Sequence, residues 1–116
     1  ESEPGGFDNV INNPLSPDSN GTAMRAAYER IAFPKIKAFK PELIIISAGF
    51  DAHQDDPLAQ LNWSTEDFVW LTKQLCALAN DLCEGRLVSA LEGGYDLNAL
   101  AASVKAHVEI LSEAAQ

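Results

Sequence analysis

The sequence predicts an α/β fold of three layers, with helices on both faces of a parallel β-sheet. Residues 43–46 and 87–91 form two short runs that are apolar almost throughout and do not alternate with polar residues, a pattern typical of strands buried on both faces. Helical patterns precede, separate and follow these runs. Strands that alternate with helices in this way form a parallel sheet with right-handed crossovers.

The first strand and the first helix are expected before residue 41. Val10 and Ile11 are predicted to form a short strand, and Thr22 is predicted to cap the helix that follows. Pro34 lacks an amide proton, so we expect it to kink or split this helix near Phe33. The apolar side chains of the helix recur at helical spacing, and they are Met24, Ala27, Tyr28 and Ile31.

The second helix lies between the two apolar runs. Ser64 or Thr65 is expected to cap it, and Gly85 is expected to end it. Trp70 lies off the apolar stripe of this helix and is expected to make a second contact. The stripe itself, which predicts the face turned to the core, consists of Phe68, Leu71, Leu75, Leu78 and Leu82.

The last helix is expected from residue 97 to residue 112, with Asp96 as its cap. His107 lies between the inward positions, where we expect a packed or half-exposed histidine and not a metal ligand. The predicted inward side chains are Leu100, Val104, Val108 and Leu111.

Length and charge narrow the classes of function. At 116 residues the chain is expected to form a single domain, residues 1–116, or part of a larger one. Its formal net charge of −9 argues against a groove that grips nucleic-acid phosphates. No apolar run approaches the roughly 18 residues needed to span a membrane, and residues 1–6 show no secretory signal. We therefore expect a cytoplasmic protein with no nucleic-acid or membrane partner.

The two cysteines are expected to be buried thiols of a reducing compartment. Cys76 and Cys83 lie seven residues apart in a helical pattern, which separates them by roughly 10 Å along one helix face. That separation is too long for a disulfide.

Polar residues follow both apolar runs at the point where each predicted strand ends. Because neighbouring parallel strands end at the same edge of a sheet, Asp51 and Tyr95 are expected to lie together there. Carboxylates and imidazoles suit Zn²⁺, and a catalytic zinc usually takes three protein ligands and a water. Asp51 and His53 could supply two such ligands. The full polar set is Asp51, His53, Asp55, Asp56, Glu92, Tyr95 and Asp96.

Plainer interpretations of the same residues stay open. Asp55 and Asp56 could cap a turn before the following proline, with His53 a loop residue. Gly93 and Gly94 could mark only a tight turn, since the pair lacks the third glycine and the spacing of a dinucleotide loop. The sequence has no Gly-x-Ser-x-Gly motif, so a serine hydrolase is not expected.

Two motifs stand in order along the chain with a helix between them, SAGFDAHQDDPL at residues 47–58 and LEGGYDL at residues 91–97. Together they resemble the histone deacetylase and acetylpolyamine amidohydrolase superfamily. The first resembles the segment carrying the third metal ligand in class II-like and bacterial members, and the second resembles the glycine-rich segment with the catalytic tyrosine. Residues 9–15, NVINNPL, resemble the strand before this region. The resemblance covers nearly the whole chain and implies part of an arginase- or deacetylase-like fold.

The resemblance implies roles for individual residues. Asp51 matches a Zn²⁺ ligand, and Tyr95 matches the catalytic tyrosine, which donates a hydrogen bond to the substrate carbonyl and to the oxyanion formed from it. The implied substrate is an acetylated amine of the acetyl-lysine or acetyl-polyamine type. His53 and Asp56 match neighbours of the site, with His53 not a ligand. Implied substrate contacts at the entrance and wall of the channel are Pro57, Leu58, Gly93 and Gly94.

The sequence departs from the family pattern upstream. The family's other two ligands, an Asp-x-His pair, and its tandem histidines have no counterpart, because no histidine precedes His53. The chain therefore resembles the carboxy-terminal third of a deacetylase domain. We expect it to be a fragment that is inactive alone, and the zinc of the complete family domain is not expected to be retained by it.

Two other functions are kept as alternatives. The first is a non-catalytic, truncated assembly module, whose exposed sheet edge would favour pairing, so a homo-oligomer of the isolated chain is expected. The second is a binding module in which the Asp-rich loop holds Ca²⁺ or Mg²⁺ through oxygen ligands alone.

Overall fold

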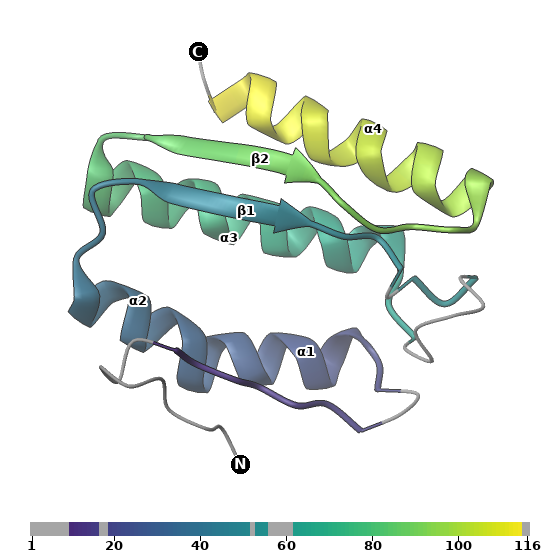
Figure 1. Cartoon of the computed structure of the whole chain (residues 1–116), viewed down its shortest axis with the longest axis horizontal. Coiled ribbons are helices and arrows are strands. Elements are labelled where there is room, and N and C mark those ends of the chain that lie inside the picture. The colour runs from purple at the N-terminus through teal and green to yellow at the C-terminus, as the bar shows by residue number, and fades with distance from the viewer. Residues whose placement is uncertain (1–9, 17–18, 52, 56–61, 115–116) are drawn as a thin grey trace.

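The computed structural model describes residues 10–16, 19–51, 53–55 and 62–114 and confirms an α/β fold with a parallel sheet (Figure 1). None of the described helices is long and apolar enough to cross a membrane. The elements are α1 (Gly21–Ala27), the π-helical stretch η1 (Tyr28–Ala32), α2 (Phe33–Phe39), β1 (Ile44–Ala48), α3 (Thr65–Cys83), β2 (Leu87–Leu91) and α4 (Leu97–Ala114).

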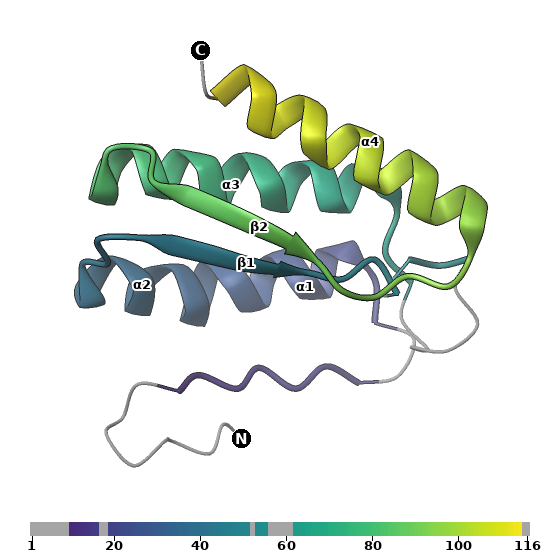
Figure 2. The same ribbon diagram turned by 45° about the horizontal axis from the view of Figure 1, so that its top comes forward.

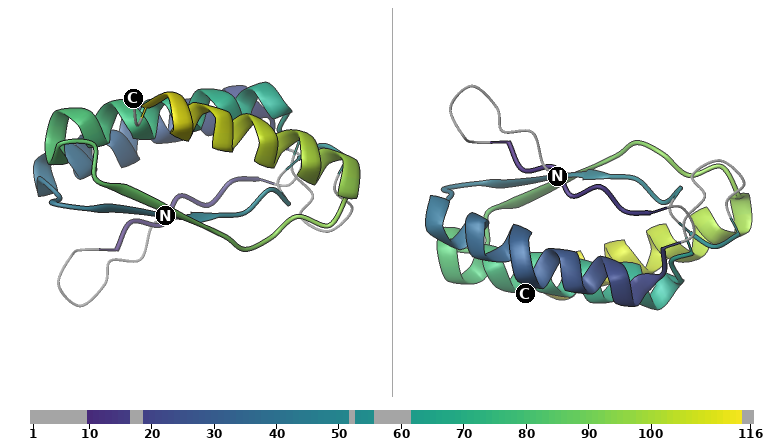
Figure 3. Two further views of the ribbon diagram at one scale, coloured as in Figure 1. Left: turned by 90° about the horizontal axis from the view of Figure 1, so that it is seen from above. Right: turned by 90° about the horizontal axis from the view of Figure 1, so that it is seen from below.

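The two strands lie side by side and run parallel. Their register pairs Ile44 with Leu87 at one end and Ala48 with Leu91 at the other. All of the described helices gather on one face of this sheet, as both panels of Figure 3 show. The described residues therefore supply the sheet and one of the two helical layers that the sequence predicts.

Burial of the strands on both faces was a wrong expectation. Ile45 of β1 is 68% exposed and Val88 of β2 is 54% exposed, because both side chains point away from the helices. An apolar run predicts that a strand forms. Its sequence does not specify whether another element covers the second face of that strand.

The first helix begins earlier than predicted and changes its winding before Pro34. Asn20, not Thr22, is the N-cap, and its side-chain oxygen accepts a hydrogen bond from the Ala23 amide at 3.1 Å. The expected distortion is present, since α1 passes through the π-helical stretch η1 immediately before α2. Pro34 lies in the first turn of α2, directly after the wider winding of η1.

The strand predicted at Val10 and Ile11 is not formed. Residues 10–16 carry no regular secondary structure. Only two apolar residues stand together here, between asparagines and before Pro14, and proline cannot donate to a sheet ladder.

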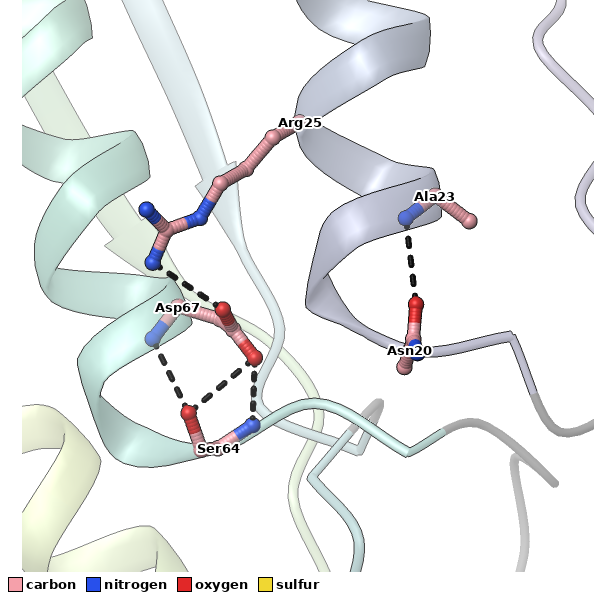
Figure 4. A network of polar contacts seen from close by, with 5 residues as sticks. All are labelled: Asn20, Ala23, Arg25, Ser64 and Asp67. Atoms are coloured by element: carbon pink, nitrogen blue, oxygen red, sulfur yellow. Dashed lines mark hydrogen bonds and ion pairs between the residues drawn. The ribbon is translucent and has the colours of Figure 1, made fainter.

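The start of α3 is fixed by a capping box, and Ser64, one of the two predicted caps, is the N-cap. The Asp67 amide donates to Ser64 Oγ at 3.3 Å, and the Ser64 amide donates to Asp67 Oδ2 at 2.8 Å. Arg25 reaches from α1 and donates to Asp67 Oδ1 at 3.1 Å (Figure 4). A Cβ on Gly21 would overlap the Asp67 carboxylate, so glycine at this position lets α1 approach α3.

Trp70 makes the second contact that its place off the stripe predicts. The Arg25 guanidinium lies 5.0 Å from the centre of the Trp70 ring, and Phe33 packs against the same ring at 6.0 Å between centroids. Arg25 therefore joins α1 to α3 through a carboxylate and an aromatic face together.

The inward face of α4 differs from the prediction by one residue position. Asp96 caps the helix as expected, accepting from the Ala99 amide at 2.8 Å. Leu100 and Val104 pack against the core, whereas Val108 is exposed. The fully inward face is instead formed by small or polar side chains, which are Ala99, Ser103 and His107.

The core lies between the sheet and the helices near the carboxyl ends of the strands. Ala48, Phe50 and Phe68 form its buried centre, with Trp63 and Leu100 among the side chains packed around them. Cys76 and Cys83 are buried free thiols, as predicted. Burial raises the pKa of the Cys76 thiol above its ordinary value, which keeps this sulfur protonated and unreactive.

His107 is packed, as expected, and joins three elements through hydrogen bonds. Thr72 Oγ1 of α3 lies 2.8 Å from its Nδ1, and Ser89 Oγ of β2 lies 2.8 Å from its Nε2. Thr72 donates its own proton to the Phe68 carbonyl, so it must accept from His107 Nδ1–H. In the neutral ring, which burial favours, Nε2 then accepts from Ser89.

Acidification is expected to destabilise the fold through His107. Burial lowers the pKa of this imidazole below its ordinary value, so the unfolded chain binds a proton at pH values where the folded chain does not. The free energy of unfolding should therefore decrease as the pH falls below about 6.5 and level off below the folded-state pKa. Urea denaturation at several pH values from about 5 to about 8, on both sides of the ordinary histidine pKa, measures this free energy. His107→Gln should reduce the pH dependence, and an unchanged slope in that variant would contradict the assignment.

Candidate functional site

The carboxyl ends of β1 and β2 carry the candidate site. Figure 2 shows both strands ending at the same side of the molecule, beside the start of α4. The ladder continues past the strands, because the Glu92 amide donates to Ala48 O at 2.9 Å and the Phe50 amide donates to Gly93 O at 2.8 Å. This pairing places Asp51, the next residue, beside Gly93.

A pocket of about 340 Å³ opens at this edge of the sheet. It brings Asp51 and Tyr95 together with Gly93, as the parallel pairing of the strands predicts. Their chemical roles stay predictions. Tyr95 is 59% exposed, and the complete lining consists of Ser47, Gly49, Asp51, Glu92, Gly93 and Tyr95.

Two glycines make room for the Asp51 carboxylate. A Cβ on Gly93 would lie 3.3 Å from Asp51 Cγ, and a Cβ on Gly49 would lie 3.3 Å from Asp51 Oδ1. Both distances are tighter than ordinary van der Waals contact between carbon and its neighbours. The Asp51 carboxylate therefore lies directly against the backbone of Gly49 and of Gly93.

Gly94 supports the site from behind and does not line the pocket. Its φ angle is 139°, which residues with a side chain rarely adopt. A Cβ there would lie 2.7 Å from Leu100 Cδ1 and 3.4 Å from Phe50 Cβ. Glycine at this position thus allows the chain that leads to Tyr95 to pack directly on the core.

The remaining predicted residues lie away from the pocket lining or outside the described residues. His53 is buried and bonded to Thr65 of α3. Asp55 is exposed, with its backbone amide donating to His53 Nδ1 at 3.1 Å. Asp56, Pro57 and Leu58 lie outside the residues that the structure describes.

Ser47 and Gly49 line the pocket but were not singled out from the sequence. Side chains alternate in direction along extended backbone, so Ser47, Gly49 and Asp51 share one side of the chain. Gly49 and Ser47 lie two and four residues before Asp51. This alternating spacing could have identified them from the sequence.

The described residues do not by themselves form a zinc site. Among residues 10–16, 19–51, 53–55 and 62–114, no group of three or more His, Cys, Asp or Glu side chains could hold a metal ion. Asp51 presents a carboxylate to the pocket, and Glu92 is the second acidic residue in the lining. A catalytic zinc takes three protein ligands, so a zinc ion at this pocket would need further ligands from outside this set.

The chain is similar to known deacetylases over most of its length. The sequence profile of the histone deacetylase domain matches residues 2–111. The chain is 46% identical over 105 residues to type-2 histone deacetylase 1 of Dictyostelium discoideum, covering 90% of this chain and 7% of that protein. It is 45% identical over 95 residues to histone deacetylase 14, chloroplastic, of Arabidopsis thaliana, covering 82% of this chain and 22% of that protein.

Solved structures agree with the sequence comparisons. The HDA15 HD domain superposes with a TM-score of 0.77 and 32% identity, covering 87% of this chain and 28% of that one. The acetylpolyamine aminohydrolase from Burkholderia pseudomallei superposes with a TM-score of 0.76 and 26% identity, covering 88% of this chain and 28% of that one. The chain thus spans less than a third of these relatives, and by fold and sequence it belongs to the histone deacetylase family.

Proposed function

We propose that the chain supplies one side of the active site of a zinc-dependent deacetylase, which hydrolyses the amide bond of an acetylated amine. The observation that carries the proposal is the shared pocket, where an Asp51 carboxylate and a Tyr95 phenol lie at the ends of neighbouring parallel strands. The substrate would be of the acetyl-lysine or acetyl-polyamine type, as in the family.

Each residue of the pocket has a role suited to its chemistry. Asp51 would give one oxygen ligand to the zinc of a complete site, and the backbone at Gly93 would form part of the channel wall. Tyr95 would donate its phenolic proton toward the substrate carbonyl oxygen. That hydrogen bond strengthens as negative charge develops on the oxygen, and it therefore favours the transition state over the bound substrate.

The described residues bring no histidine to the pocket that could act as the general base. The chain has two histidines, and neither lines the pocket. His107 is bonded to Thr72 and Ser89, and His53 is bonded to Thr65. Proton transfer from the attacking water to a histidine therefore needs a residue from outside the described set.

The 116-residue chain alone is accordingly expected to be inactive. An assay of the purified chain with an acetyl-lysine peptide and with an acetylated polyamine, each with added Zn²⁺, should show no turnover above background. Zinc-dependent turnover that Asp51→Asn abolishes would show that the chain holds a complete site.

A hybrid protein tests the proposed contribution directly. In it, this chain replaces the matching 28% of the HDA15 HD domain, so that the rest of that domain supplies the missing groups. The hybrid should bind Zn²⁺ and hydrolyse an acetyl-lysine peptide, and Asp51→Asn should lower its zinc content measured by mass spectrometry. A folded, zinc-bound hybrid whose activity does not depend on Asp51 or Tyr95 would contradict the proposal.

A second candidate function is self-association without catalysis. The observation that favours it is the uncovered sheet face, which exposes Ile45 and Val88. Two such faces could cover one another and remove apolar surface from water. Light scattering of the isolated chain at tens of micromolar, roughly the range of weak association, should then show a dimer or larger, and Val88→Lys should shift it toward a monomer. A monomeric wild-type chain would count against this function.

A further inference from the structure

His53 lies two residues after Asp51, but its side chain packs into the molecule and not into the pocket. The residue is 5% exposed, and its ring is stacked on Phe68 with an interplanar angle of 4° and 6.4 Å between centroids. Its backbone amide donates to Phe50 O at 3.3 Å. The polypeptide therefore turns sharply around Asp51, from the core at Phe50 back to the core at His53.

The hydrogen bonds of His53 define which ring nitrogen carries the proton. The Asp55 amide donates to Nδ1 at 3.1 Å, so Nδ1 presents its lone pair. In the neutral ring the proton then resides on Nε2, and Nε2–H donates to Thr65 Oγ1 at 3.2 Å. The ring thus binds the turn through Nδ1 and binds α3 through Nε2.

Thr65 belongs to a part of α3 that is itself well fixed. It is the first residue of the helix and follows Ser64, the N-cap of the capping box with Asp67. Asp67 is also bonded to Arg25 of α1 (Figure 4). A second link runs beside it, since the Gln54 amide donates to Trp63 O at 2.7 Å.

We propose that His53 is a positioning residue, which holds the Asp51 carboxylate at the pocket by tying its turn to the start of α3. A ligand must be held within about 0.5 Å of its working position to act well. Asp51 is followed by a turn, and the ladder bond from Phe50 to Gly93 fixes only the side of the turn that precedes it. On the other side, the His53 ring ties the turn to α3, beside the backbone bond from Gln54 to Trp63. The inference rests on the proposed function in taking Asp51 as a metal ligand.

The experiment compares two identical substitutions in the full chain. Thr65→Val removes the acceptor of His53 Nε2–H, and Thr72→Val removes a hydroxyl bonded to His107, on the same helix and away from the turn. The readout is the χ1 angle of Asp51, from three-bond couplings of its Cγ in NMR spectra of the metal-free chain. Wild type and Thr72→Val should show one rotamer, and Thr65→Val should show an average over several.

Substitutions of His53 itself complete the test. His53→Ala should average the Asp51 rotamer, whereas His53→Gln, whose amide nitrogen reaches toward Thr65, should restore a single one. The nitrogen shifts of the wild-type ring should place its proton on Nε2. A proton on Nδ1, or an Asp51 rotamer that stays single in both His53→Ala and Thr65→Val, would overturn the proposal.

Metal analysis of the hybrid with the HDA15 HD domain separates this proposal from the proposed function, because the rest of that domain supplies the other ligands. The hybrid should hold Zn²⁺, and Asp51→Asn should lower its zinc content. An unchanged zinc content in Asp51→Asn, with the couplings as expected, would contradict the metal role of Asp51 and leave its positioning by His53 supported.

Discussion

Replacing Phe68 by alanine is expected to lower the free energy of unfolding by about 3–5 kcal/mol, the usual cost of deleting a buried phenyl ring. Phe68 is 5% exposed, and other aromatic rings of the core pack against it. Its centroid lies 5.1 Å from that of Phe50 and 5.4 Å from that of Trp63. The truncation would leave a cavity between α3 and the turn that carries Asp51.

Such a loss is large against the roughly 5–15 kcal/mol by which small domains are stable. Urea denaturation followed by circular dichroism measures it. Phe39→Ala is the matched control, because Phe39 is 73% exposed and its truncation should cost little. Equal losses in the two variants would contradict the position assigned to Phe68 in the core.

Replacing Tyr95 by phenylalanine in the hybrid with the HDA15 HD domain is expected to lower kcat about 10²–10³-fold, as does loss of one donor to a developing oxyanion. The substitution keeps the ring and removes only the hydroxyl. Because the bond forms chiefly in the transition state, KM should change much less than kcat. Steady-state kinetics with an acetyl-lysine peptide give both constants.

The chain contains one other tyrosine, which provides the control. Tyr28 lies in η1 against Phe33, at 5.4 Å between centroids, and it does not line the pocket. Tyr28→Phe should leave kcat nearly unchanged. If it lowered kcat as much as Tyr95→Phe, the effect would be one of folding and not of catalysis.

The sequence predicts well those features that local chemistry decides. Ser64 precedes an acidic first turn and a regular apolar stripe, and it caps α3 as expected. Asp51 and Tyr95 each follow an apolar run, and the parallel pairing of those runs brings both to one pocket. The assignment of the family needed only the two motifs in their order.

Features that depend on a distant partner escaped prediction. His107 was expected to be packed, but the sequence did not show that it and Ser103 occupy the inward face of α4 in place of Val108. The apolar stripe could not reveal this, because Thr72 and Ser89, which satisfy the histidine, lie on two other elements. In the same way, the exposure of Ile45 depends on where the helices pack and not on the strand itself.

The parallel pairing of β1 with β2 also decides how the sheet can nucleate. A hairpin brings antiparallel strands together through a short turn, but the first bond between these strands must enclose the whole of α3. The entropy of closing that long loop is therefore lost before any ladder bond compensates for it. Asp51 and Gly93 come together only when that closure is complete, so this edge of the molecule cannot assemble from local contacts alone.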